Sequence, residues 1–148
     1  MEPFLSNFVH NVDSKGRVSV PASFRQALAS RGNRDLYAMQ SITRPAIEVG
    51  GPDLLERYEA QMVAADPFGE TYQDLALLAY GDGAFLKFDS EGRISVTDFI
   101  RQHTGITDKI VFVGMKHFFQ LWEPARFEAQ RAAARARLSA PVRKSSPE

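Results

Sequence analysis

The chain has 148 residues, 44% of them hydrophobic and 24% charged, with a formal net charge of zero and no cysteine. This length and hydrophobic content suit one compact domain, or two halves that share one core, and they exclude an intrinsically disordered chain. The absence of cysteine excludes disulfides, thiolate chemistry and cysteine-ligated zinc, and zero net charge excludes a uniformly basic surface for nucleic acid.

The first part of the chain alternates short strands with one helix. Apolar periodicity and turn residues predict a strand, a turn, a strand, a helix and two strands, over residues 4–12, 13–16, 17–20, 22–28, 36–40 and 46–49. Pro21 fits the first position of that helix, and Gly32 ends it.

A helical spacer follows, and then the first part is repeated. Apolar residues at helical spacing predict two helices over 53–64 and 72–79. The second part is predicted as a strand, a turn, a strand, a helix and two strands, over residues 84–88, 89–92, 93–96, 98–103, 109–113 and 118–122. A last helix opens at Pro124, and residues 139–148 have the composition of a disordered tail.

The same eight-residue pattern occurs twice, 76 positions apart. DSKGRVSV at 13–20 recurs as DSEGRISV at 89–96, and Arg25-Gln26 matches Arg101-Gln102 at the same offset. A duplicated supersecondary unit explains this repetition. Because a lone half cannot bury both faces of so few short strands, we expect the halves to pair about a pseudo-two-fold axis and to close a small barrel.

These residues resemble a known family. The strand–D-x-x-G-R–strand–helix unit is similar to the AbrB-like swapped-hairpin barrel, and two such units joined by a helical spacer resemble the MraZ family of bacterial transcriptional regulators. The resemblance covers about residues 4–130 and is carried by DSKGRVSVPASFRQAL, DSEGRISVTDFIRQHTGI and VGMKHFFQLWEP. It implies a mainly β fold with flanking helices (α+β), in which a duplicated AbrB-like swapped-hairpin barrel closes within one chain.

The resemblance also implies a domain plan and a function. It divides the chain into a first AbrB-like DNA-binding unit, a helical spacer, a second AbrB-like unit, and a C-terminal helix with a disordered tail, over residues 7–54, 55–82, 83–126 and 127–148. The implied function is sequence-specific binding of double-stranded DNA, at direct repeats in the promoter of its own division and cell-wall operon. The implied assembly is a ring homo-oligomer at the nucleoid, without a cofactor.

The resemblance places the functional residues on the two repeated turns. The implied DNA contacts are Lys15, Arg17 and Arg93. The implied turn-shaping residues are Asp13, Gly16, Asp89 and Gly92, of types that accept backbone N–H bonds or adopt positive φ. The second unit departs from the first, since Glu91 stands where the first has Lys15 and Thr97-Asp98 replaces the proline region.

Other interpretations of the same residues stay open. Arg17 and Arg93 can be exposed strand residues paired with Asp13 and Asp89. A separate alternative for the function is an assembly scaffold that uses the same barrel for protein contacts and binds no DNA. Helix residues Arg25 and Arg101 fit either an inward ion pair to a turn aspartate or a phosphate contact. The arginine-rich last helix fits a DNA contact, a solvated face or a subunit contact.

An enzyme is not expected. Two Asp-Ser-x-Gly turns are similar to the paired carboxylates of aspartic proteases, but Lys15 and Glu91 interrupt the D-[ST]-G motif. An adjoining arginine would also keep each carboxylate ionised rather than sharing a proton. The three histidines lack metal-ligand spacing, so no metal site is predicted.

Charge is unevenly distributed along the chain. Residues 1–123 carry a formal charge of −4 and residues 124–148 carry +4, while 53–82 holds seven acids and one base. The apolar stripe Leu54, Tyr58 and Met62 on the acidic spacer helix is a candidate subunit contact. The first residues lack a signal-peptide pattern and no apolar run approaches a membrane span, so a cytoplasmic location is expected.

Overall fold

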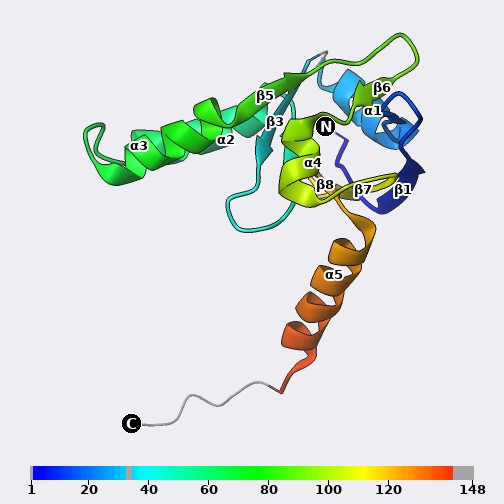
Figure 1. Ribbon diagram of the computed structural model, residues 1–148. Coiled ribbons are helices and arrows are strands. Elements are labelled where there is room, and N and C mark those ends of the chain that lie inside the picture. Colours follow the sequence, from blue (N-terminus) through cyan, green and yellow to red (C-terminus); the bar gives the residue numbers. More distant parts are fainter. Residues whose placement is uncertain (1, 33–34, 142–148) are drawn as a thin grey trace.

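The computed structural model describes residues 2–32 and 35–141 (Figure 1). The predicted strands and helices form in the predicted order, with small shifts at their ends. In chain order they are β1 (Asn7–Asn11), β2 (Arg17–Ser19), α1 (Ala22–Ser30), β3 (Leu36–Gln40), β4 (Ile47–Gly50), α2 (Pro52–Val63), α3 (Glu70–Ala76), the π-helix η1 (Leu77–Gly81), β5 (Gly83–Leu86), β6 (Arg93–Ser95), α4 (Asp98–Thr104), β7 (Lys109–Gly114), β8 (Phe119–Trp122) and α5 (Pro124–Ser139). Of the predicted disordered tail, residues 142–148 lie outside the described part.

The strand order interlocks the two halves of the chain. One antiparallel sheet has the order β1-β7-β8-β4-β3-β5, and β2 pairs with β6 in a separate two-stranded ribbon. The pairings β1 with β7, β4 with β8, β3 with β5 and β2 with β6 each join a strand of the first half to one of the second. The repeat makes β1 equivalent to β5, β3 to β7 and β4 to β8. Exchanging these equivalents gives the same strand order read from the opposite edge, as a pseudo-two-fold arrangement requires.

The closed barrel that we expected is not seen among the described residues. The edge strands β1 and β5 do not pair with each other, so the six-stranded sheet is open. Strands β2 and β6 have three residues each and pair with each other, which places Arg17 opposite Ser95 and Ser19 opposite Arg93. The ribbon therefore does not extend the six-stranded sheet, although β2 lies beside β1, where His10 contacts the carbonyl of Ser19. The fold is mixed α/β with a mostly antiparallel sheet.

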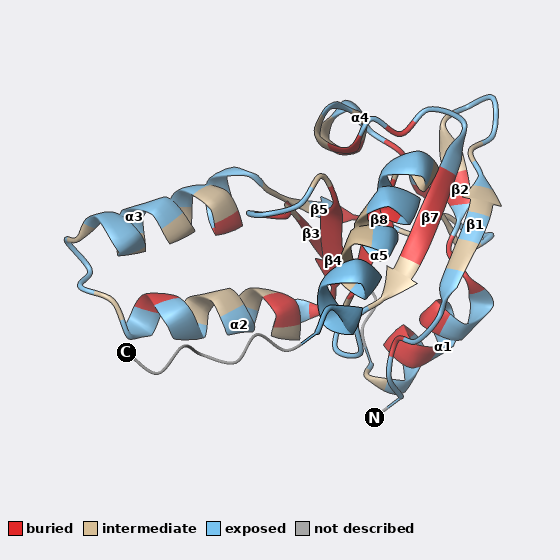
Figure 2. Ribbon diagram, turned by 90° about the horizontal axis from the view of Figure 1, so that it is seen from below, coloured by how far each residue is buried: buried red, intermediate tan, exposed pale blue. Residues whose placement is uncertain are grey.

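The main core attaches the ribbon and α1 to the sheet. Val18 and Ile94, the central residues of β2 and β6, are each 1% exposed and belong to this core. Beside them four phenylalanine rings pack with centroid separations of 5.0 to 6.5 Å, which are typical of favourable aromatic pairs: Phe4, Phe24, Phe112 and Phe119. Figure 2 shows buried residues concentrated in the sheet, whereas α3 and α5 are mostly exposed.

Helices α2 and α3 form an arm that projects from the sheet (Figure 1). Leu54 packs with Tyr37 of β3, and both Leu54 and Met62 are buried. Tyr58 donates a hydrogen bond to the buried carboxylate of Glu48 on β4. The prediction that this apolar stripe contacts another subunit is therefore wrong, because the arm needs the stripe to pack against its own chain.

Helix α5 is attached to the sheet through its first turns. Glu123 caps it, since its carboxylate accepts a hydrogen bond of 2.8 Å from the N–H of Ala125. Phe127 packs on Trp122 with ring centroids 6.1 Å apart, and Arg126 donates to the carbonyl of Thr104 at 2.9 Å. Within the described residues, no helix combines the length and apolar character needed to cross a membrane.

Candidate nucleic-acid interface

Asp13 organises the first repeated turn. Its Oδ1 accepts hydrogen bonds from the N–H groups of Lys15 at 2.9 Å and Arg17 at 2.8 Å, and its Oδ2 accepts from Arg17 Nε at 3.1 Å. Gly16 has a φ of 76°, a conformation that glycine adopts without strain. The pKa of Asp13 is lowered, first of all by the backbone hydrogen bond from Arg17, so the turn holds an ionised carboxylate.

The second turn repeats this geometry. Asp89 Oδ1 accepts from the N–H groups of Glu91 and Arg93, each at 2.9 Å, and Oδ2 accepts from Arg93 Nε at 2.8 Å. Gly92 has a φ of 75°. The backbone hydrogen bond from Arg93 is the largest cause that lowers the pKa of Asp89, and the side-chain bond to Asp89 raises the pKa of Arg93. The predicted turn-shaping residues therefore occupy equivalent positions in both units.

The ribbon presents a polar outer face between the two turns. Successive strand residues point to opposite faces, so burying Val18 and Ile94 directs the flanking side chains outward: Arg17, Ser19, Arg93 and Ser95. The two arginines are diagonal neighbours, which corresponds to a Cα separation of about 7–8 Å. Sequence reasoning had not singled out the two serine hydroxyls, although the period-2 spacing from each arginine could have identified them.

The two turns differ in how their arginines are neutralised. Among the described residues Arg17 forms an ion pair with Asp13 alone. Arg93 forms three, with Asp89 at 2.8 Å, Glu91 at 3.4 Å and Asp13 of the first turn at 3.8 Å. The asymmetry arises because the second turn carries Glu91 where the first carries a lysine, and because the interlocked halves bring Asp13 within reach of Arg93.

The formal charges of the two turns are opposite. Lys15 and Arg17 against Asp13 leave the first turn with +1, whereas Arg93 against Asp89 and Glu91 leaves the second with −1. Lys15 is exposed, and the Glu91 side chain is 69% exposed. The first turn therefore offers an accessible cation beside a partly exposed guanidinium, which suits an anionic partner.

Each turn is supported by a helix of the opposite unit. Arg25 of α1 donates to the carbonyl of Val20 at 3.1 Å and lies against Gly92, where an added Cβ would meet its Cδ at 2.8 Å. Arg101 of α4 lies against Gly16 of the first turn, where an added Cβ would be 3.8 Å from its Nη2, and it donates to the carbonyl of Val96 at 3.3 Å and to that of Thr107 at 2.8 Å. Their side chains thus bond to backbone carbonyls rather than to the turn aspartates.

The described residues contain no cluster of histidine, aspartate or glutamate that could hold a metal ion. Tyr37, Tyr58 and Tyr80 have raised pKa values, but they lie on β3, α2 and η1 and not at the ribbon. Burial is the main cause for Tyr37, whose pKa is raised to about 12. The charged groups at the candidate interface are therefore those of the two turns.

The comparisons with known proteins agree on one family. A family model described as "MraZ protein, putative antitoxin-like" matches residues 80–145. The chain is 53% identical to the transcriptional regulator MraZ of Rhizobium johnstonii over 135 residues, which is 91% of this chain and 93% of that protein. It is 38% identical to the protein of the same name from Azorhizobium caulinodans over 138 residues, covering 93% of this chain and 88% of the relative.

Proposed function

Because this chain belongs to the MraZ family, whose named members are transcriptional regulators and not enzymes, we propose that it regulates transcription by binding double-stranded DNA. The contact surface is the outer face of the β2–β6 ribbon with the turn that precedes β2. Lys15 and Arg17 are the main DNA contacts, and Arg93 is a secondary one. Asp13, Gly16, Asp89 and Gly92 hold the turns in shape.

The observation that carries this proposal is the preorganised first turn. Asp13 holds the N–H groups of Lys15 and Arg17 at 2.9 and 2.8 Å, so the backbone of both cationic residues is positioned before a partner arrives. Ordering groups on binding costs affinity, and a rigid turn avoids part of that cost. A lysine suits a phosphate as a compact point charge, and an arginine suits the O6 and N7 acceptors of guanine.

The second turn supports the first more than it contacts DNA. Three carboxylates surround Arg93, and one of them, Asp13, belongs to the first turn. A guanidinium that is neutralised in this way gains less from a phosphate than Arg17 does. The second turn therefore acts mainly by holding the first turn in place, through the ion pair between Arg93 and Asp13.

The proposed assembly and target follow from the family resemblance. Several copies form a ring, act at direct repeats in the promoter of their own division and cell-wall operon, and are associated with the nucleoid. A ring raises the apparent affinity of individually weak contacts by roughly 10²–10⁴ when its geometry allows several to engage together. The proposal also takes the two halves to be AbrB-like swapped-hairpin units at 7–54 and 83–126, with a spacer at 55–82 and a C-terminal segment at 127–148.

A gel shift with the chain's own upstream DNA at two salt concentrations tests the proposal. Arg17→Ala should cost about 1–3 kcal/mol of specific binding and relax the preference at one base pair. Lys15→Ala should weaken binding to all sequences and flatten the salt slope by about one unit. Lys116→Ala is the matched control, because it removes an exposed lysine far from the first turn. The first turn lies at the Lys109 end of β7, where Lys109 pairs with Asn11 of β1, whereas Lys116 follows the other end of β7.

The outcomes separate the two function classes. Binding that is absent even at low salt would overturn the DNA-binding proposal and favour an assembly scaffold. Equal losses on specific and random DNA for both Lys15→Ala and Arg17→Ala would overturn the assignment of Arg17 as a base contact.

A further inference from the structure

One face of α5 lies uncovered beyond its attachment to the sheet. The helix is anchored by Phe127, which is 8% exposed, and then extends away from the sheet (Figure 1). Residues at i, i+3, i+4 and i+7 line one helix face, and here that face forms a shallow groove of about 440 Å³ lined by Arg131, Ala134, Arg135, Leu138 and Ser139. Leu138 is 88% exposed. An isolated helix of this length is marginal in water, so a partner surface would stabilise it.

Arg131 and Arg135 are the two cations of this face. Arg131 already pairs with Glu128 at 2.6 Å and lies 5.1 Å from the centroid of the Phe127 ring. Arg135 forms no ion pair within the described ranges 2–32 and 35–141. The uncovered strip therefore combines apolar groups with a free guanidinium, and a complementary surface needs a carboxylate beside a small apolar residue.

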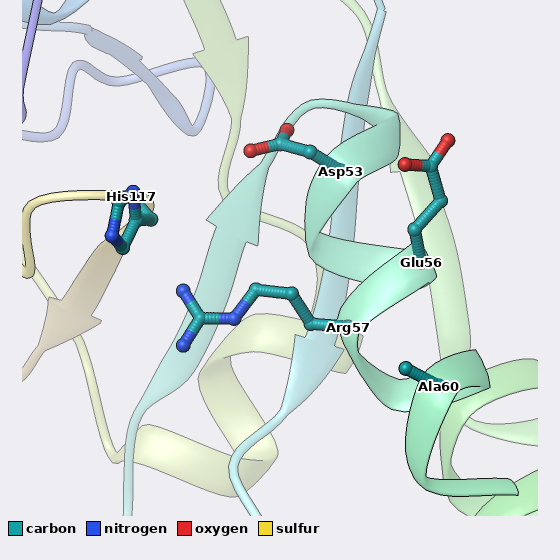
Figure 3. Close-up of a pocket in the computed structure, with 5 residues that line it drawn as sticks. All are labelled: Asp53, Glu56, Arg57, Ala60 and His117. Carbon is teal, nitrogen blue, oxygen red and sulfur yellow. The ribbon is translucent and has the colours of Figure 1, made fainter.

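The chain carries such a surface beside α2. A hollow of about 430 Å³ lies between α2 and the turn from β7 to β8, lined by Asp53, Glu56, Arg57, Ala60 and His117 (Figure 3). Figure 3 shows Arg57 extended from α2 toward His117, whereas the Glu56 carboxylate points away from that pair. Glu56 is exposed and forms no ion pair with any residue that the structure describes. Glu56 and Ala60 are one turn apart, so they present a carboxylate and a methyl group on one ridge.

We propose that the uncovered face of α5 docks on the Glu56–Ala60 ridge of α2, at the edge of this hollow, in a second copy of this chain. Arg135 of one copy pairs with Glu56 of the other, and Leu138 packs against Ala60. Charge complementarity supports this occupant, since the hollow is lined by the carboxylates of Asp53 and Glu56 against the guanidinium of Arg57, and α5 holds four arginines against one glutamate. This inference deepens the proposed ring by naming its contact surfaces.

The arrangement of the elements favours a second copy over the same copy or DNA. Within one chain, α5 and the α2–α3 arm project from the sheet in different directions (Figure 1). Helix α5 also runs away from the part of the molecule that carries β6 and the ribbon (Figure 1). Because donor and acceptor surfaces differ, the contact is head-to-tail, and it closes into a ring when the rotation between copies permits.

A charge exchange between the two surfaces tests the inference. Arg135→Glu and Glu56→Arg should each raise the dissociation constant of the oligomer about tenfold or more, because like charges would face each other. Combining both substitutions in one chain should restore assembly, since each contact then pairs opposite charges again. Size is measured without DNA by native mass spectrometry and sedimentation at low and high salt, with circular dichroism to verify folding. Leu138→Ala should weaken assembly without changing any charge.

Two matched controls carry the same charge changes elsewhere. Arg137→Glu alters the arginine two positions further along α5, on another face, and Asp74→Arg alters an exposed acid on α3. Both should leave the oligomer unchanged. A charge-exchanged double variant that stays dissociated would overturn the proposed pair.

The remaining outcomes distinguish this inference from the proposed function. If Arg135→Glu keeps the wild-type size but loses affinity for a single DNA repeat, α5 is a DNA contact and the inference is overturned. A monomeric wild-type chain would overturn both the ring and this interface, whereas the gel shift judges DNA binding independently.

Discussion

Reversing the charge of Glu91 should convert the second turn into a second cationic DNA contact. The Glu91 side chain is 69% exposed, and the turn is held by the bond from its backbone N–H to Asp89 at 2.9 Å, which Glu91→Lys leaves in place. The substitution removes one of the three carboxylates around Arg93 and changes the formal charge of the turn from −1 to +1. The second turn then matches the first in charge.

The expected magnitude follows from counterion release. One additional phosphate contact steepens the slope of log K against log salt by about 0.9. Between about 50 and about 200 mM salt, this slope corresponds to an additional loss of affinity of about 3.5-fold. Fluorescence anisotropy with one promoter repeat, over a series of salt concentrations, measures both the slope and the gain at low salt.

Two controls separate the local effect from the overall charge. Glu91→Gln removes the carboxylate without adding a cation, and it should give an intermediate gain by freeing Arg93. Asp74→Lys adds the same two charge units on α3, away from the ribbon, and should leave the slope near the wild-type value. If Glu91→Lys leaves the slope unchanged while Lys15→Ala flattens it, the second turn does not face DNA and the reasoning fails.

Two further predictions concern the stability of the turns. Gly16→Ala should cost about 1–2 kcal/mol in urea unfolding because of its positive φ, whereas Gly92→Ala should cost about 1 kcal/mol more, because its Cβ displaces Arg25 and weakens a hydrogen bond; equal losses would show that this contact is unimportant. The lowered pKa values of Asp13 and Asp89 contribute stability that is complete above the ordinary carboxyl pKa and is lost as pH falls through the lowered folded-state values. The free energy of unfolding should therefore drop in strong acid, and less in a double Asp→Asn variant; identical acid dependence in the variant would contradict this.

The repeated turns could be predicted from the sequence because their structure is local. Asp13 and Asp89 each bond to residues two and four positions ahead, so the D-x-x-G-R spacing contains the whole motif. Period-2 and helical patterns likewise predicted the order of the strands and helices. The 76-residue offset predicted that both turns belong to equivalent units.

The tertiary structure decided which features of the two units remain equivalent. Arg93 approaches Asp13, and Arg25 lies against Gly92, only because strands of opposite halves pair with each other. The same pairing left the sheet open, since the three-residue strands β2 and β6 form their ladder hydrogen bonds with each other and not with the edge strands β1 and β5.

The physical reason is the range over which a pattern acts. Hydrogen bonds within about four residues depend on residue type and spacing, which a sequence displays directly. Which carboxylate of the other turn reaches Arg93, and which side chain lies against Gly92, depends on residues roughly 65 to 80 positions away that the interlocked halves bring into contact. The sequence by itself therefore determined two equivalent turns of opposite formal charge, and the tertiary structure brought the Asp13 carboxylate of the first turn to the Arg93 guanidinium of the second.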